Sequence, residues 1–571
     1  MGPDTKVSQK FSFLLAPPQK KKWMSRVLRP GVLFLVLFIW GILQFSQGSF
    51  IFKKPHKPHK GHHKSPPPDE AFSWENITPE KHLVYHPCFD EYQCARLEVP
   101  MDWNRTDGKG ATVEVAVIRL PAKVPVTDPR YGGPIILNPG GPSGSGVSQA
   151  IKRGRMLQDL VDFGESPESP NSQSEDAKYF DIVSFDPRGV NNTTPAFSCF
   201  ANPEDRIAWT FQTIAEGNIA SSDIAFDTLW ARGQALGETC TNPSLFDKDE
   251  SEWLGRFMNT PTVIADMVEL VERHGEWREN ETKKLLKKSC AHKLPRAEKK
   301  KVLEKNSWKR GEERLLYWGF SYGTVIGATF AALQPNKIHR LIVDGVVDSY
   351  DFYAGNWLAN LQDSDGALNT FFENCHEAGP QSCPFASDDL QDLKDRFQRV
   401  LEDLKRSPLA VPASKSRGPE IVTYSDIHTL VFSSLYSPVD SYPLVAQVFT
   451  DLSQRNGSSA ADFKAYARKE GIDEKHAKEV LSSVLCTDGA DFRGMNKSEY
   501  REYLKALEDQ GHFIGDDWAA LRLSCPGWNI RPAWEFNAPL KCRVDSLILK
   551  FYIKIQRATA HFLLNPIARL E

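Results

Sequence analysis

The stretch that decides the fold is RLLYWGFSYGTVIGATFAAL, residues 314–333. A short apolar run enters Gly-Phe-Ser-Tyr-Gly at residues 319–323, and a helical run of small residues follows it. A tight strand-to-helix turn of this kind strains the central serine and lifts its hydroxyl out of the sheet, while the glycines let strand and helix pack closely. The helix N-terminus also favours negative charge at the serine. The pattern predicts Ser321 as a nucleophile, with a structural turn serine as the alternative.

A glycine-rich turn upstream supplies a second part of this site. Residues 132–146 read GGPIILNPGGPSGSG, a buried strand followed by glycines. A serine nucleophile on such a turn needs two backbone N–H donors for its oxyanion, one after the serine and one from an earlier loop. We predict the amides of Tyr322 and Gly141, because Pro142 has no N–H to donate. The rival interpretation, a phosphate-binding loop, is disfavoured because no Gly-Lys-Ser/Thr follows.

Short apolar runs alternate with helical patterns along the body. The runs occupy residues 134–138, 180–185, 315–318 and 338–347, whereas residues 262–274 carry apolar positions at helical spacing. Buried strands that alternate with amphipathic helices predict a doubly wound, mostly parallel α/β sheet. Such sheets bind ligands outside the carboxyl ends of their strands, which is where the glycine-rich and acidic residues fall.

The composition is that of a globular protein. Of the 571 residues, 41% are hydrophobic and 25% are charged, which excludes wholesale disorder. The net charge of −3 gives no electrostatic reason to expect a nucleic-acid partner. The expected segments are a basic N-terminal segment (1–30), a transmembrane signal anchor (31–52), a Pro/His/Lys-rich stalk (53–75), the α/β core (80–350), a helical cap inserted after a sheet strand (351–484) and a C-terminal region (485–571).

Residues 31–52 form an uncharged span. The span is about long enough to cross a bilayer as one helix, and no clear cleavage site of small residues follows it. We therefore expect an uncleaved signal anchor; the alternative is a cleaved signal peptide that releases a secreted body. The stalk histidines show no metal-ligand spacing, and we expect neither a metal nor a cofactor.

Acceptor asparagines and cysteines both indicate the secretory pathway. Asn-x-Ser/Thr acceptors occur only after the uncharged span, which predicts a glycosylated lumenal or extracellular body. They are Asn76, Asn104, Asn191, Asn192, Asn280, Asn456 and Asn496. Ten cysteines suffice to brace loops in an oxidising compartment, although a sequence alone cannot prove their connectivity. By proximity or order the expected pairs are Cys88–Cys94, Cys199–Cys240, Cys375–Cys383 and Cys486–Cys525, leaving Cys290 and Cys542.

Four motifs, taken in order, resemble those of the tripeptidyl-aminopeptidase-like α/β-hydrolases, which are relatives of prolyl iminopeptidases. The motifs are Asn138-Pro139-Gly140-Gly141-Pro142, Phe185-Asp186-Pro187-Arg188-Gly189, Gly319-Phe320-Ser321-Tyr322-Gly323 and Asp344-Gly345-Val346-Val347-Asp348. The resemblance covers residues 88–536. It implies an α/β-hydrolase fold and a serine exopeptidase that removes short peptides or single residues from free N-termini, with the cap restricting access. It also implies that Asp186 and Arg188 are structural and pair beneath the site.

The C-terminal segment departs from the family pattern, in which an acid loop and then a histidine follow the serine. After residue 540 the sequence reads as truncated or aberrant, and no triad acid or histidine is identified. Only His561 lies where a triad histidine is due, and Asp344 or Asp348 could supply an acid from an earlier strand. Two alternatives therefore stay open: an esterase or lipase on the same scaffold, and a catalytically dead hydrolase-like binding protein. Oligomeric state has no signature in the sequence.

Overall fold

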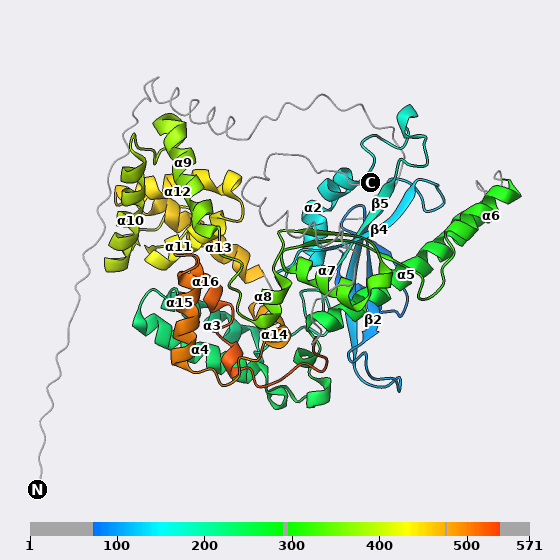
Figure 1. The fold of residues 1–571 in the computed structure, drawn as a ribbon, viewed down its shortest axis with the longest axis horizontal. Helices are drawn as coiled ribbons and strands as arrows, with labels where there is room; N and C mark the ends of the chain where they lie inside the picture. The colour runs from blue at the N-terminus through cyan, green and yellow to red at the C-terminus, as the bar shows by residue number, and fades with distance from the viewer. Residues whose placement is uncertain (1–71, 289–294, 474–476, 537–571) are drawn as a thin grey trace, which may run out of the picture. The chain divides into compact units, whose positions relative to one another are not determined.

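The computed structural model of this chain describes residues 72–288, 295–473 and 477–536 (Figure 1). The expected basic segment, the signal anchor, most of the stalk and the tail from residue 537 lie outside the described residues. Within those described, no helix combines the length and the apolar character needed to cross a bilayer.

Seven strands form one mixed sheet (Figure 1). The strands are β1 (His86–Cys88), β2 (Tyr92–Pro100), β3 (Thr112–Leu120), β4 (Tyr131–Asn138), β5 (Tyr179–Phe185), β6 (Leu315–Phe320) and β7 (Ile338–Asp344). They lie in the order β1-β2-β3-β5-β4-β6-β7. The pairs from β1 to β5 are antiparallel, and β5, β4, β6 and β7 are parallel. This order, with its parallel half, fits the α/β-hydrolase fold.

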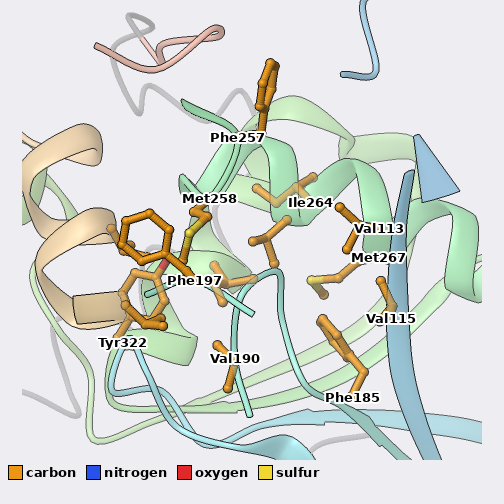
Figure 2. Close-up of a cluster of buried hydrophobic side chains, with 14 of the residues drawn as sticks. Val113, Val115, Phe185, Val190, Phe197, Phe257, Met258, Ile264, Met267 and Tyr322 are labelled. Carbon is orange, nitrogen blue, oxygen red and sulfur yellow. The ribbon is translucent and has the colours of Figure 1, made fainter. Parts of the chain in front are cut away.

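Helices cover both faces of the sheet because successive side chains on each strand point to opposite sides. On β4, Ile136 packs in one cluster with helices α5 (Thr260–Lys287) and α7 (Tyr322–Leu333). Its neighbour Leu137 packs in a different cluster with α2 (Gly146–Val161). Figure 2 shows part of the cluster on the α5 side, with Phe185 of β5 among its members. The predicted doubly wound arrangement is therefore confirmed, but the predicted mostly parallel sheet is mixed, with three antiparallel and three parallel pairs among the described strands β1 to β7.

The remaining helices mostly follow β5 and β7. They are α3 (Pro203–Glu216), α4 (Asp223–Cys240), α6 (Arg296–Lys305), α8 (Ser349–Ala354), α9 (Ser364–Ser382), α10 (Leu390–Arg406), α11 (Tyr424–Ser434), α12 (Pro438–Ser453), α13 (Ser458–Asp473), α14 (Ala477–Asp488), α15 (Lys497–Glu508) and α16 (Gly515–Ala520). A short hairpin pairs β8 (Leu409–Val411) with β9 (Glu420–Val422). Helices α9 to α13 share a hydrophobic core of their own. On α10, for example, Leu393, Phe397 and Leu404 are buried at helical spacing.

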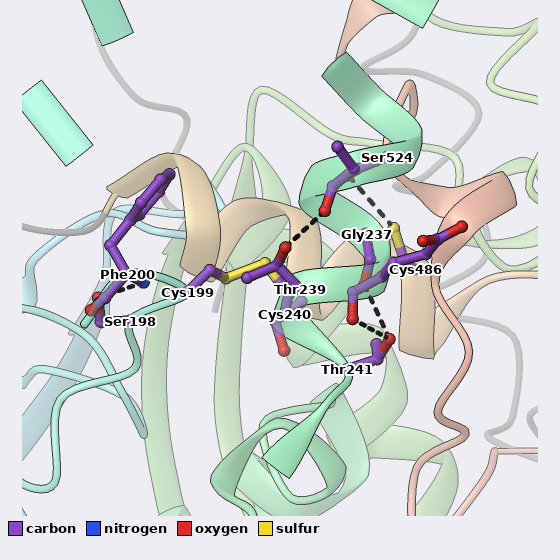
Figure 3. The surroundings of a disulfide bond; sticks show 12 residues. Ser198, Cys199, Phe200, Gly237, Thr239, Cys240, Thr241, Cys486 and Ser524 are labelled. Carbon is purple, nitrogen blue, oxygen red and sulfur yellow. Dashed lines mark hydrogen bonds between the residues drawn. A yellow bond between two sulfur atoms is a disulfide. The ribbon is translucent and has the colours of Figure 1, made fainter. Parts of the chain in front are cut away.

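All four expected disulfides form. Cys88–Cys94, Cys199–Cys240, Cys375–Cys383 and Cys486–Cys525 each have their sulfur atoms at bonding distance. Figure 3 shows the Cys199–Cys240 bond, with Cys486 also in view. The two unassigned cysteines, Cys290 and Cys542, lie outside the described residues.

Candidate active site

Ser321 occupies the turn between β6 and α7, with φ 53° and ψ −125°. A positive φ costs a residue with a side chain free energy, so the surrounding structure must hold it. The Ser321 N–H donates to the Asp344 carbonyl at the end of β7 at 3.0 Å, and the Thr324 N–H donates to the Ser321 carbonyl at 2.8 Å. The residue is exposed. The strained geometry is therefore held from two sides, as expected for an accessible nucleophile.

Close packing around the turn explains its flanking glycines. A Cβ on Gly319 would lie 2.4 Å from the Gly323 carbonyl oxygen. A Cβ on Gly323 would lie 2.7 Å from the Asn138 carbonyl oxygen at the end of β4. Real Cβ atoms do not approach backbone oxygens so closely, so any side chain at either position would push the strand and helix apart.

The glycine-rich loop after β4 lies directly against this turn. A Cβ on Gly140 would lie 2.4 Å from the Phe320 carbonyl oxygen and 2.8 Å from the Tyr322 amide nitrogen. The Gly140 N–H donates to Asn138 Oδ1 at 2.8 Å, which fixes the start of the loop. The two segments that were predicted to supply the oxyanion donors, those of Gly141 and Tyr322, are thereby brought together.

The backbone amides of Gly141 and Tyr322 donate no hydrogen bond within the described part of the chain. Tyr322 is the first residue of α7, so its N–H has no acceptor inside the helix. Two free N–H groups, that of Tyr322 at a helix N-terminus and that of Gly141 in the adjacent loop, form beside an exposed hydroxyl a suitable site for a developing oxyanion.

Asp186 and Arg188 follow β5 and are buried, but the expected pairing between them is wrong. The Asp186 carboxylate accepts hydrogen bonds from the Ser145 hydroxyl at 2.6 Å and the Asn192 side-chain amide at 2.8 Å. Arg188 instead forms a two-pronged ion pair with Asp266 on α5, at 2.5 and 2.7 Å. Both oxygens of the Asp266 carboxylate face the guanidinium fork, whereas the oxygens of Asp186 already accept from Ser145, Val147 and Asn192. Both residues are structural, as expected.

The histidines do not complete a triad within the described residues. Those that follow Ser321 there are His339, His376, His428 and His512. None of them hydrogen-bonds to Ser321, and the Ser321 hydroxyl makes no hydrogen bond to any described residue. His561, the histidine expected at the triad position, lies outside the described residues, as does His476.

The two candidate acids, Asp344 at the end of β7 and Asp348 just after it, have other surroundings. The Asp348 side chain caps α8 and accepts from the amides of Tyr350 and Asp351 at 2.9 and 3.2 Å. Asp344 is exposed and offers Ser321 only its backbone carbonyl. Neither carboxylate pairs with a histidine in the described ranges. In those same ranges β7 pairs only with β6, so its other edge has no strand partner among the described residues.

One set of side chains has the composition of a metal site. Ligand atoms of His428, Asp516 and Asp517 lie within 4.8 Å of one another. They already interact without an ion: His428 Nδ1 lies 3.1 Å from the Asp517 carboxylate and 2.7 Å from the Asn218 side-chain amide. An ion pair between α11 and α16 accounts for this cluster, and its residues are not those that build the serine turn.

Sequence reasoning missed a buried carboxyl behind Tyr322. Asp488, the last residue of α14, accepts hydrogen bonds from the Thr260 N–H at 2.8 Å and the Thr260 hydroxyl at 2.6 Å. The Tyr322 hydroxyl lies 2.5 Å from Thr260 Oγ1 and 3.5 Å from Asp488 Oδ2. Burial raises the pKa of Asp488 to about 7. In the sequence, Asp488 is marked only by its position two residues after Cys486, which forms a disulfide. That position predicts that Asp488 is buried, but it does not predict a part in the active site.

Comparison with known proteins finds serine hydrolases among the relatives of this chain. No family model matches the chain. It is 26% identical over 347 residues to the serine protease Hip1 of Mycobacterium tuberculosis, covering 60% of this chain and 53% of that protein. It is 24% identical over 457 residues to the tripeptidyl aminopeptidase of Streptomyces lividans, covering 78% and 69%. A 112-residue segment is 34% identical to carboxylesterase B of M. tuberculosis, covering 20% and 18%.

The chain thus spans about half the length of Hip1, the first of these relatives. Together the matches confirm the resemblance to tripeptidyl-aminopeptidase-like serine hydrolases that the four motifs indicate.

Proposed function

We propose that this chain is a serine hydrolase in which the Ser321 hydroxyl attacks a substrate carbonyl to form an acyl-enzyme. The amides of Gly141 and Tyr322 stabilise the negative charge that develops on the carbonyl oxygen. The observation that carries the proposal is an exposed serine held at φ 53° beside two amides that donate to no described residue. If this position served only to form the turn, glycine would suit it better, because glycine adopts a positive φ without strain.

The proposed substrates are peptides with a free N-terminus, from which the enzyme releases short peptides. The fold alone does not fix a substrate, so this part rests on similarity to a tripeptidyl aminopeptidase and a serine protease. The local match to a carboxylesterase keeps ester hydrolysis as a second candidate. Because Ser321 has no acid–histidine partner in the described ranges, a binding protein without catalysis is the third candidate.

A fluorophosphonate probe tests the nucleophile. We expect the full chain to be labelled once, and the variant Ser321→Ala to lose all labelling, because the probe forms a covalent bond only with an activated serine. Ser437→Ala is the matched control, since Ser437 is also exposed and its side chain makes no capping hydrogen bond. Mass spectrometry of the labelled peptide identifies the site. An unlabelled wild-type chain would rule out the enzyme and leave the binding protein.

Substrate panels then divide the two enzyme candidates. We expect turnover of tripeptidyl arylamides with a free N-terminus, and little turnover when the same peptides are acetylated. Faster hydrolysis of simple acyl esters than of every peptide arylamide would instead assign an esterase.

We also propose that residues 31–52 anchor the protein in a membrane, with the body on the lumenal or extracellular side. The support is the uncharged span itself, the acceptor asparagines that all follow it and the four disulfides, which persist in oxidising compartments. Release as a secreted protein after cleavage is the alternative.

Glycosidase treatment tests this location residue by residue. We expect peptide-N-glycosidase F to lower the mass of the protein made in secretory cells, and Asn104→Gln or Asn280→Gln to remove one glycan each, since both asparagines are exposed. Asn192 should carry none, because its side-chain nitrogen donates to Asp186 at 2.8 Å inside the body. A chain without any glycan would contradict the lumenal location. A glycan on Asn192 would contradict the structural assignment of that loop.

A further inference from the structure

The carboxylate of Asp488 caps a helix that belongs to a distant part of the sequence. Helix α5 begins at Thr260, and the residue before it, Asn259, gives it no side-chain cap. Asp488 from α14 takes that place by accepting from both the N–H and the hydroxyl of Thr260. Carboxyl oxygens at a helix N-terminus accept from N–H groups that have no partner inside the helix, so α5 and α14 are joined at this point.

The same pair of residues holds the phenol of Tyr322. The Tyr322 hydroxyl lies within hydrogen-bond distance of Thr260 Oγ1, at 2.5 Å, and its ring packs at 5.6 Å from that of Phe352 on α8. Tyr322 is only 6% exposed, although it directly follows the exposed Ser321. One end of this residue is thus fixed in the core, while its amide lies at the serine turn against Gly140.

We propose that Asp488, acting through Thr260, is a positioning residue that sets the place of the Tyr322 amide in the oxyanion site. This inference rests on the proposed function. A rigid phenol held at its far end limits the rotation and translation of the whole residue, including its N–H. Oxyanion donors act only when they are fixed at the position that the charge will occupy, and a displacement of about 1 Å can cost 100-fold in rate.

The charged and titratable groups around Asp488 determine how its contribution to stability depends on pH. Tyr322 on α7, Tyr353 on α8 and Arg522 after α16 face it, and the Arg522 guanidinium donates to the Phe352 carbonyl at 3.3 Å. Burial raises the pKa of Asp488 to about 7, from an ordinary value of 3.8. The folded protein therefore binds more protons than the unfolded chain between these pH values, so the contribution of Asp488 to stability falls as pH rises through them and stays low above pH 7.

The variants Asp488→Asn, Thr260→Val and Thr260→Ser test the proposal in the full chain. With a peptidyl arylamide and active-site titration, we expect Asp488→Asn and Thr260→Val to lower kcat about tenfold or more with KM within about twofold. Thr260→Ser keeps the hydroxyl and should retain most of kcat. At pH 8 the melting temperature of Asp488→Asn should not fall below that of the wild type, because the variant removes a charge that burial disfavours. Asp491→Asn is the control, since Asp491 is exposed and pairs with Arg493.

Each outcome decides a different claim. Slower turnover without lost stability at pH 8 supports positioning, since a merely structural residue would lower both together. An unchanged kcat in Asp488→Asn, or a kcat that falls only in step with the melting temperature, overturns the positioning role while the enzyme stands. A wild-type chain that neither labels with fluorophosphonate nor turns over substrate overturns the proposed function, and the positioning role with it.

Discussion

Replacing Gly140 with alanine should lower fluorophosphonate labelling of Ser321 by about 100-fold or more, with a comparable loss in kcat. The added methyl group would lie 2.4 Å from the Phe320 carbonyl oxygen and 2.8 Å from the Tyr322 amide nitrogen. Both atoms are backbone, so neither can rotate aside, and the loop must move away from the serine turn. That movement separates the two oxyanion donors, which are needed at the same oxygen.

Gly133→Ala is the matched control for this experiment. Gly140 and Gly133 have similar backbone angles, φ 86° and 90°, but a Cβ at Gly133 meets nothing within 4 Å. The strain of placing alanine at positive φ is therefore common to both variants, and only Gly140→Ala adds the clash. We expect both variants to lower the melting temperature, Gly140→Ala by more because of its clash, but a large loss of labelling for Gly140→Ala alone. Equal labelling of the two variants would show that the loop does not form the oxyanion site.

Replacing Arg188 with methionine should destabilise the body by about 3–5 kcal/mol, because it leaves the Asp266 carboxylate buried without its cation. Both side chains are nearly inaccessible, at 0% and 2% exposure. Arg188 also donates to the carbonyls of Pro100 and Met101, which would lose a partner at the end of β2. Denaturant unfolding of the folded body measures the change in free energy of unfolding.

Two further variants make this result interpretable. Lys505→Met removes one partner of an exposed pair with Asp509, 72% and 65% exposed, and should leave the free energy of unfolding nearly unchanged, because solvent screens such a pair. Removing both buried charges, with Arg188→Met and Asp266→Leu together, should cost less than Arg188→Met alone, because no unpaired charge remains. If Arg188→Met were as mild as Lys505→Met, the ion pair would not hold α5 against the sheet.

The sequence predicts the serine turn well because its causes are local. The glycines at residues 319 and 323, the apolar run before them and the small residues after them all lie within one strand, one turn and one helix. The partner of Arg188 could not be predicted in this way, because Asp266 lies 78 residues further along the chain on the polar side of a helix pattern. The order and proximity of the cysteines predict four disulfide pairs, and the structure forms all four.

Asp488 shows the other limit of sequence reasoning. The sequence around a single acid at the end of a helix does not show whether its side chain caps another helix or lies in solvent. Its role depends on the meeting of α14, α5 and α7, which are far apart in sequence and are brought together by the core. Buried contacts between distant segments, and not local propensity, carry this part of the site.

The disulfides Cys199–Cys240 and Cys486–Cys525 have a consequence for how the chain reaches this state. They close segments of 41 and 39 residues, and each such closure removes unfolded-chain entropy worth about 4 kcal/mol. Cys486 lies two residues before Asp488 on α14. A chain synthesised among reduced thiols would explore a broader unfolded ensemble and would hold the end of α14 less firmly. Activity would then depend on the redox history of the protein, although none of the eight disulfide-bonded cysteines belongs to the serine turn.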